Sequence, residues 1–229
     1  MPGRTDFFAR VALQGKRVRL EPLTLRHVGD LALAGADAAI WQWLPTAHDA
    51  PGTMEAFIRA ALAQQALRKA VPFATIDTTS STAVGSTRYH FIEPEQRRLE
   101  IGFTWVSSLF QRSHVNTEAK FLQLWYAFEV LGCRRVEFKA DAENFKSRAA
   151  ILRLGAREEG LFRKHMIYPD GRNRDSVYFA MLDDEWADAK AFLLSRLAYD
   201  PEPQVIAARE ARRSNSESGG TNLSFQGDP

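Results

Sequence analysis

The stretch from residue 99 to residue 144 constrains the fold of this chain more than any other. An apolar, strand-like run at residues 101–106 enters a short polar loop at residues 107–114, and a long helix with an apolar stripe begins near Val115. A second strand follows, so the stretch predicts a β-loop-α-β unit. The first turn of a helix offers unpaired backbone N–H groups and the positive end of the helix dipole, which together attract anions. We therefore expect any phosphate-bearing cofactor to bind at this loop.

The composition is that of an ordinary globular protein, with 45% apolar and 25% charged residues among 229. A chain of this length is expected to form one domain with a sizeable core. Its 30 basic residues are balanced by 28 acidic ones, which leaves a formal net charge of +2. Nucleic-acid-binding surfaces are strongly basic, so this balance gives no indication of a nucleic-acid partner.

Cys133 is the one cysteine of the chain, which excludes an internal disulfide and a metal centre built on several thiolates. We expect it to pack as a small apolar side chain, and we expect no metal in the site. No stretch approaches the roughly 20 apolar residues that a membrane span needs. The charged N-terminal residues do not resemble a signal peptide. A cytoplasmic protein without a membrane partner is therefore expected.

The segments before the central unit have clear periodic patterns. They predict an irregular arm at residues 1–15, a strand at residues 16–21, a helix at residues 24–35 and a second helix that starts at Thr53. Between the two helices, Trp41 and Trp43 stand close to Pro45. These tryptophans either line a substrate cleft or pack in the core, as aromatic side chains usually do.

The remaining segments complete a mixed α/β chain. Strands are expected at residues 72–77, 84–92, 99–106, 134–141, 156–168 and 174–182. The crossover to the strand at residues 134–141 has the length of a parallel connection. Asn144 is a good cap for a helix that ends at Gly155, and a last helix runs to about Tyr199. We place one domain at residues 16–199 and expect residues 200–229 to form a disordered tail.

Four ordered motifs resemble the GNAT N-acetyltransferase superfamily, over residues 16–195. They are EIGFTWV at residues 100–106, VNTEAK at residues 115–120, RRVEFKAD at residues 134–141 and N-x-x-S-x-A-A-I-x-R-L-G-A at residues 144–156. Within the superfamily the likeness is to the branch of the ribosomal-protein alanine N-acetyltransferases. The resemblance implies the GNAT fold, an α/β (α+β) architecture with a mixed central sheet of about six to seven strands, a splayed parallel pair and helices on both faces.

The resemblance also implies acetyl-CoA as the donor and an amine as the acceptor. In this family the pantetheine arm pairs with main-chain groups freed where the parallel strands splay, which implies Phe103, Thr104, Trp105 and Val106. The pyrophosphate binds a Q/R-x-x-G-x-G/A loop, which aligns with Gln111, Arg112, Ser113, His114, Val115 and Asn116, followed by Thr117. Further cofactor contacts are expected from Asn144 and Arg148.

The loop departs from the family pattern at His114, which stands where the family has its first glycine. Glycine permits close approach of the backbone to phosphates, so a side chain here changes the space available. Three interpretations of His114 stay open. The ring points outward without a role, it donates to a phosphate beside Arg112, or it narrows the loop and weakens cofactor binding. Asn116 replaces a glycine or alanine and is compatible with the loop, because it can cap a helix.

Amide formation needs one group that takes a proton from the attacking amine and one that gives a proton to the departing thiolate. Glu100 is the first choice as base, ahead of Glu137 and Asp141, although each is alternatively a solvated carboxylate. Many relatives use a tyrosine as the acid at the position that Ile151 occupies here. Ser147 resembles the serine used in the ribosomal branch and is the expected acid, or alternatively only supports the helix cap.

The sequence therefore predicts an acetyl-CoA-dependent N-acetyltransferase that acts by direct attack in a ternary complex. Its acceptor is expected to be a protein N-terminus or a small-molecule amine, bound between residues 41–51 and residues 168–174, and a homodimer is compatible with the sequence. The alternative is a non-catalytic GNAT-like module that senses acyl-CoA or binds a partner. His114 and the absent tyrosine favour that alternative, whereas Asn144, Ser147 and the intact strand and helix motifs favour the enzyme.

Overall fold

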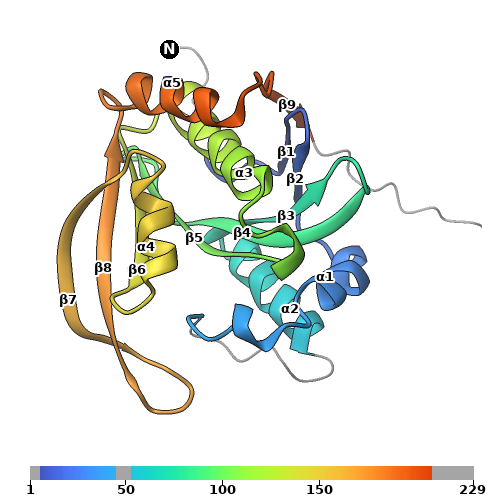
Figure 1. The fold of residues 1–229 in the computed structure, drawn as a ribbon, viewed down its shortest axis with the longest axis vertical. Helices are drawn as coiled ribbons and strands as arrows, with labels where there is room; N and C mark the ends of the chain where they lie inside the picture. Colours follow the sequence, from blue (N-terminus) through green and yellow to red (C-terminus); the bar gives the residue numbers. More distant parts are fainter. Residues whose placement is uncertain (1–5, 45–52, 208–229) are drawn as a thin grey trace, which may run out of the picture.

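The computed structural model describes residues 6–44 and 53–207, and these residues form one nine-stranded sheet with helices on both faces (Figure 1). The strand order is β7-β8-β6-β5-β4-β3-β2-β1-β9. The strands are β1 (Val11–Gln14), β2 (Val18–Pro22), β3 (Ala70–Asp77), β4 (Thr82–Glu93), β5 (Arg98–Val106), β6 (Arg135–Asp141), β7 (Arg157–Ile167), β8 (Asn173–Leu182) and β9 (Gln204–Ala207). The helices are α1 (Val28–Ala34), α2 (Thr53–Ala66), α3 (His114–Trp125), α4 (Phe145–Leu152) and α5 (Trp186–Leu197), with a π-helical turn at Tyr126–Val130 after α3.

Among the described strands, β5 and β6 are the one parallel pair, and every other neighbouring pair is antiparallel. The crossover between β5 and β6 contains α3, as a parallel connection requires. Strand β3 lies near the middle of the sheet and is buried along its whole length, which explains its continuous apolar sequence. The predicted mixed sheet with one parallel pair is therefore confirmed.

Two apolar clusters fix the helices to opposite faces of the sheet (Figure 1). Helices α3, α4 and α5 share a cluster with the sheet, in which Leu122, Ile151 and Leu193 pack with Phe73. On the other face, Leu31 of α1 and Phe57 of α2 join a second cluster. Within the part of the chain that the structure describes, no helix is long and apolar enough to cross a membrane.

The sheet has more strands than expected, because β1 and β9 pair with each other at its far edge. β1 lies in the segment predicted as an irregular arm, and β9 lies in the predicted tail. Their register runs from Val11 opposite Ala207 to Gln14 opposite Gln204. All residues of β9 are exposed, so main-chain pairing with β1 orders it without a burial pattern that a sequence would reveal. The rest of the predicted tail, residues 208–229, lies outside the described residues.

Cys133 follows the π-helical turn and is buried, as its sequence context predicts. Burial raises the pKa of its thiol to about 12. Since the thiolate is the reactive form of cysteine, this side chain is chemically inert at neutral pH. Its burial and raised pKa do not favour Cys133 as a nucleophile.

Candidate active site at the splayed strands

The parallel strands β5 and β6 pair over three residues only and then separate. Their register runs from Arg98 opposite Arg135 to Glu100 opposite Glu137. β5 continues to Val106 and β6 to Asp141, but these later residues do not pair with each other. The main chain of β5 at residues 101–106 thus has no sheet partner on the β6 side. An extended ligand can satisfy such main-chain groups in the way an added strand does.

A β-bulge shapes β5 just beyond this separation. Gly102 pairs with Arg88 of β4 and Trp105 pairs with Ser86, so two residues of β5 oppose one residue of β4. Phe103, the first bulged residue, has a φ of 49°. A left-handed conformation is costly for a bulky side chain, by about 1 kcal/mol or more, and such outliers concentrate at functional sites.

Lys120 of α3 supports the bulge from one face of the sheet. Its Nζ atom donates to Thr104 Oγ1 at 2.6 Å, to Thr87 Oγ1 at 2.9 Å and to Gln123 Oε1 at 2.8 Å. The lysine is only 5% exposed, and burial lowers its pKa well below the ordinary value. The Thr104 side chain is therefore engaged within the protein, so its main chain is what remains for a ligand.

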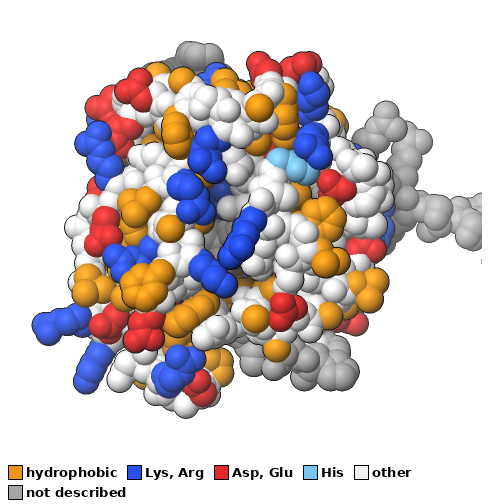
Figure 2. All heavy atoms as spheres, in the orientation of Figure 1, with side chains coloured by type: hydrophobic (Ala, Val, Ile, Leu, Met, Phe, Trp, Pro, Cys, Tyr) orange, Lys and Arg blue, Asp and Glu red, His pale blue; other side chains and the backbone are white. Residues whose placement is uncertain are grey.

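The loop between β5 and α3 has the features of an anion cradle. Ser113 caps α3, since its Oγ accepts from the N–H of Val115 at 3.2 Å. Arg112 is exposed and has a φ of 60°, the conformation for which glycine is usually selected. Gln111 donates to the carbonyl of Val106 at 3.4 Å, which ties the loop to the end of β5. Figure 2 shows Lys and Arg side chains gathered along the middle of this face, in the region between α3 and α4.

His114 begins α3 and is turned toward β3. Its Nε2 atom lies 3.9 Å from Oδ1 of Asp77, and its side chain is 17% exposed. Burial and the charge of Arg17 lower the pKa of His114 and outweigh Glu118 and Asp77, which raise it. The interpretation of an outward-pointing ring does not fit this placement. A phosphate contact and a narrowed loop both stay predictions, as do cofactor contacts of its partly buried neighbours in the helix, Asn116 and Thr117.

Glu100 is buried at the point where β5 and β6 part. Its Oε1 atom lies 3.0 Å from Nε2 of His90 and 3.8 Å from Nζ of Lys139. A Cβ on Gly102 would collide with the His90 ring, so the glycine lets this imidazole lie across β5. Burial raises the pKa of Glu100, but His90, Lys139 and Arg174 together outweigh it, and the net pKa is lowered. Glu100 is therefore ionised at neutral pH, next to an imidazole.

The other two carboxylates considered as bases have structural partners. Glu137 accepts from Arg98 at 3.0 Å and from Arg135 at 2.7 Å. Asp141 accepts from the hydroxyl of Tyr168 at 2.6 Å and from a main-chain N–H in the following turn. Both carboxylates are thus held by donors of the surrounding strands and turns, whereas Glu100 lies where β5 and β6 separate.

The start of α4 brings Asn144 and Ser147 together. Asn144 caps the helix as predicted, with its Oδ1 accepting from the N–H of Ser147 at 3.0 Å. The hydroxyl of Ser147 is partly exposed and makes no hydrogen bond with the residues that the structure describes. Arg148 donates to the carbonyl of Ala142 at 3.0 Å and pairs with Glu158 at 3.2 Å, so its predicted phosphate contact competes with these partners.

Sequence reasoning missed His90 and Lys139, which complete the surroundings of Glu100, and it missed Arg88. Arg88 and His90 alternate along β4 and therefore share a face, which the strand pattern could have revealed. Their proximity to Glu100 depends on the β4–β5 register, in which His90 stands opposite Glu100. A bulge sets that register locally, so the sequence alone did not reveal it.

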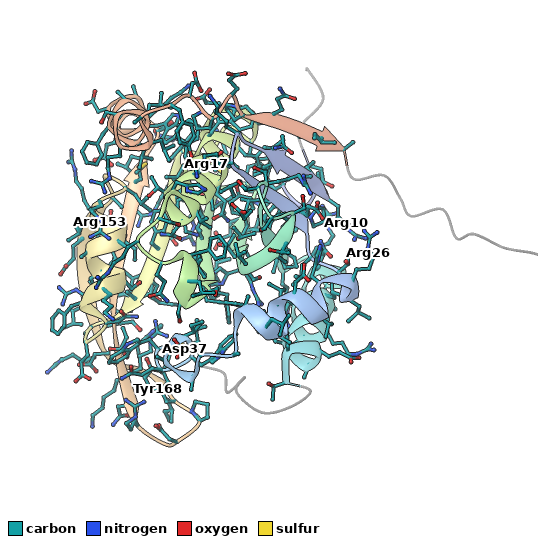
Figure 3. All side chains as sticks on the ribbon, turned by 45° about the vertical axis from the view of Figure 1, so that its right-hand side comes forward. Arg10, Arg17, Arg26, Asp37, Arg153 and Tyr168 are labelled. Atoms are coloured by element: carbon teal, nitrogen blue, oxygen red, sulfur yellow. The ribbon has the colours of Figure 1, made fainter. Side chains whose placement is uncertain are left out.

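The expected acceptor site is described only in part. Trp41 is buried and donates to the carbonyl of Gly35, and its ring packs against that of Trp105 with centroids 4.9 Å apart and planes tilted by 53°, so it packs in the core. Residues 45–52 lie outside the described residues. Figure 3 shows Asp37, in the segment between α1 and α2, and Tyr168, beside the β7–β8 turn, at the same end of the molecule.

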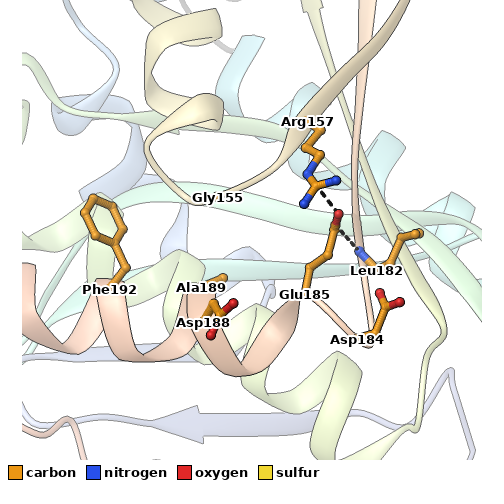
Figure 4. A pocket seen from close by; sticks show the side chains of 8 residues that line it. All are labelled: Gly155, Arg157, Leu182, Asp184, Glu185, Asp188, Ala189 and Phe192. Carbon is orange, nitrogen blue, oxygen red and sulfur yellow. Dashed lines mark hydrogen bonds and ion pairs between the residues drawn. The ribbon is translucent and has the colours of Figure 1, made fainter.

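A hollow of about 560 Å³ lies elsewhere, between the α4–β7 turn and α5. Figure 4 shows Arg157 paired there with Glu185, which also accepts from the N–H of Leu182. Arg157, Glu185 and the N–H of Leu182 thus satisfy one another at the start of α5, and none of the residues that line the hollow belongs to β5, β6 or the loop before α3. We assign the chemistry of this chain to the splayed strands instead.

Comparison with known proteins gives one consistent family. The family model described as acetyltransferase (GNAT) domain matches residues 17–157. The chain is 36% identical over 106 residues to "Putative ribosomal N-acetyltransferase YdaF" of Bacillus subtilis (strain 168), a match that covers 46% of this chain and 57% of that protein. It is 31% identical over 88 residues to "Uncharacterized N-acetyltransferase YnaD" of the same organism, covering 38% of this chain and 50% of that protein. The matches thus span little more than half the length of these curated relatives.

A solved structure shares both the fold and much of the length. The crystal structure of a GCN5-related N-acetyltransferase from Brucella melitensis superposes with a TM-score of 0.78 at 34% identity. The superposition covers 85% of this chain and 87% of that one. The family resemblance predicted from the four sequence motifs is confirmed by these matches.

Proposed function

The chain belongs to the GNAT acetyltransferase family, and we propose that it transfers an acetyl group from acetyl-CoA to a primary amine by direct attack in a ternary complex. One observation carries this proposal. A buried, ionised carboxylate, Glu100, lies at the point where β5 leaves β6 and its main chain becomes free to pair with an extended ligand.

Acetyl-CoA supplies the reactive thioester, and two segments of this chain are suited to hold it. The main chain of β5 at residues 101–106 offers unpaired groups to the pantetheine arm. The loop at residues 111–117 offers the N-terminus of α3 to the pyrophosphate, with exposed Arg112 beside it. The His114 ring is turned toward Asp77, and the N–H groups of the first turn of α3 other than that of Val115, which Ser113 caps, are suited to bind a phosphate.

The residues around the separation divide the proton chemistry between them. Glu100 takes the proton of the attacking amine, with Nε2 of the His90 imidazole 3.0 Å from its Oε1 atom. His90 and, to a smaller extent, Lys139 and Arg174 outweigh burial and lower the pKa of Glu100, which favours the ionised carboxylate. The partly exposed Ser147 hydroxyl passes its proton to the departing thiolate and regains one from water. No acyl-enzyme is required, because the amine attacks the thioester directly.

The test is to titrate the purified protein with acetyl-CoA by calorimetry, with a thermal-shift measurement in parallel. A ligand that binds only the folded state raises the unfolding midpoint, so micromolar binding and a raised midpoint are expected. Free thiol release is then measured with a panel of primary amines. The variant Glu100→Gln is the matched control, since it is expected to bind acetyl-CoA normally while losing turnover.

Absence of binding at millimolar acetyl-CoA would overturn this proposal. The non-catalytic alternative would then lead, because two observations favour it. His114 replaces the first loop glycine, and Ile151, at the position of the family tyrosine, is buried in the core. Binding of acetyl-CoA without turnover on any amine of the panel would support an acyl-CoA sensor.

A further inference from the structure

Arg88 is a buried arginine without an ionic partner, on the face of the sheet that α1 and α2 cover. It is 6% exposed. Its guanidinium carbon lies 4.0 Å from the ring centroid of Phe103 and 5.2 Å from that of Phe57, so two aromatic rings flank it. Its Nε atom is buried without a hydrogen-bond partner. Within residues 6–44 and 53–207, no acidic side chain pairs with it.

Such an arrangement is costly for the fold. A charge removed from water is tolerated when an opposite charge or good hydrogen bonds compensate it, and unpaired buried donors are rare. Burial lowers the pKa of Arg88 to about 10, so the guanidinium still carries its charge at neutral pH. Stacking on Phe103 and Phe57 compensates only part of this cost. Within the part of the chain that the structure describes, no acidic side chain and no acceptor for Nε compensates the remainder.

Trp105 presents a second unsatisfied donor close by. It pairs with Ser86 on β4, two residues before Arg88, and packs with its ring centroid 6.4 Å from that of Phe57. Its indole Nε1 is also buried without a hydrogen-bond partner. Both donors thus contact the same ring of α2 and flank the β5 bulge. Acceptor atoms of a ligand would satisfy both.

We propose that Arg88 binds a carboxylate carried by the acceptor amine, on the α2 side of the splayed strands. This inference rests on the proposed acetyl transfer and names its acceptor class. Arginine is suited to the role, because its planar fork binds carboxylates with two parallel hydrogen bonds. The unpaired positive charge excludes purely cationic acceptors such as polyamines, which it would repel.

The register gives the spacing between amine and carboxylate. Arg88 and His90 are alternate residues of β4, and Glu100 stands opposite His90. Alternate residues of a strand are about 6 to 7 Å apart, so the carboxylate is expected about 5 to 8 Å from the reacting amine. A small amino acid with a short spacer has this spacing. So does an acidic side chain in the first residues of a protein N-terminus.

The test measures the binding of conjugates that occupy the CoA site and the acceptor site at once. The sulfur of CoA is joined through a –CH2–CO– bridge to the amine of β-alanine, 4-aminobutanoate or 6-aminohexanoate. Each acid has a matched carboxamide that differs only in charge. A peptide arm uses the same bridge to an Asp-Ala amide and to an Asn-Ala amide. Dissociation constants are measured by calorimetry with the full chain, so the result does not depend on turnover.

With at least one spacer, the acid is expected to bind about tenfold more tightly than its amide, since hydrogen bonds to charged groups are strong. The preference is expected to vanish in Arg88→Met. Arg98→Met is the matched control, because Arg98 lies on the same sheet but is paired with Glu93 and Glu137, and its removal is expected to leave the preference unchanged. If the acid binds more tightly than the amide only among the amino-acid conjugates, the acceptor is a small molecule. If it does so only among the peptide conjugates, the acceptor is a protein N-terminus.

Equal binding of acid and amide in every matched pair would overturn the inference while leaving acetyl transfer intact, provided that CoA and the conjugates bind. Failure of CoA, acetyl-CoA and all conjugates to bind would instead overturn the proposed function. A preference that persists in Arg88→Met would assign the carboxylate to another residue. Should Arg88→Met not fold, Arg88→Lys decides, because it keeps the charge but loses the planar fork and is expected to weaken the preference.

Discussion

Lys120 and Arg88 are two buried basic side chains on opposite faces of the same bulge, and their own hydrogen bonding differs. Lys120, on the α3 face, makes three hydrogen bonds to neutral oxygen atoms. Arg88, on the α2 face, contacts aromatic rings, and its Nε has no acceptor. Thr87 and Arg88 are adjacent in β4, so their side chains point to opposite faces of the sheet. The Thr87 hydroxyl accepts a hydrogen bond from Lys120 on the α3 face, whereas Arg88 Nε on the α2 face has no acceptor among the described residues.

This difference in hydrogen bonding suggests that the α3 face supports the bulge, whereas the α2 face offers the binding surface. A hydrogen-bonded buried side chain fixes a local conformation, here the left-handed backbone of Phe103 beside Thr104. A buried donor without a partner is costly in the free protein and is retained where a ligand supplies the missing acceptor. The α2 face also holds Glu100 and His90, so the unpaired donors and the proposed base lie on the same side of β5.

The largest expected effect concerns chemistry on the α2 face. Replacing the proposed base by Glu100→Gln keeps the shape of the side chain but removes its capacity to take a proton. Turnover measured by free thiol release should fall by at least about a hundredfold, the usual contribution of a general base. Affinity for acetyl-CoA, measured by calorimetry, should stay the same. Unchanged turnover would move the base elsewhere and break the assignment of chemistry to this face.

The second prediction compares the two faces directly through the free energy of unfolding. Thr104→Val removes an acceptor of Lys120 and leaves a buried donor unsatisfied, which should cost about 1 to 3 kcal/mol. Arg88→Met removes a buried charge that has no partner, so it should cost nothing or stabilise the fold. Urea unfolding of both variants at neutral pH checks this. A larger loss of unfolding free energy in Arg88→Met than in Thr104→Val would contradict the distinction between the two faces.

A smaller effect is expected at the start of α4. Ser147→Ala should lower turnover about tenfold if its hydroxyl protonates the thiolate, with little change in acetyl-CoA affinity. The N-cap hydrogen bond uses the main chain of residue 147 and survives the substitution. Lys146→Ala, an exposed neighbour in the same turn, is the control and should leave turnover unchanged. Turnover of Ser147→Ala equal to that of the original chain would exclude Ser147 as the group that protonates the thiolate.

The smallest effect is expected from His114→Ala. Because the ring is turned toward Asp77, its loss should change the acetyl-CoA dissociation constant by no more than about twofold. Calorimetry with both proteins measures this. A much tighter complex would show that the ring narrows the loop. A much weaker complex would show that the ring contacts the cofactor, and the α3 face would then take part in binding as well as support.

The elements of the fold could be predicted where local patterns are strong. The β-loop-α-β unit and the Asn144 cap depend on periodicity and on a capping residue, whereas the separation of the parallel strands is expected only from the family resemblance. Ser113, expected at the cofactor loop, proved to be the cap of α3. The unit and the caps need only the order of residues along a short stretch, which a sequence contains.

The partners of the site residues could not be predicted in the same way. The contact between His90 and Glu100 and the isolation of Arg88 depend on the register of two strands and on a bulge, which no short stretch determines. The direction of the His114 ring depends on Asp77, far away in the sequence. Such facts arise from packing between distant segments, so they appear only when the whole chain is folded.

The pairing of β1 with β9 has a consequence for how this sheet is assembled during synthesis. β1 leaves the ribosome first among the strands and β9 last, so nearly the whole chain separates the two partners. Contacts between residues so distant form late, because closing a long loop costs much entropy before any contact is gained. Until β9 arrives, the outer edge of β1 is open to other chains, and a nascent protein is most exposed to edge-to-edge aggregation there.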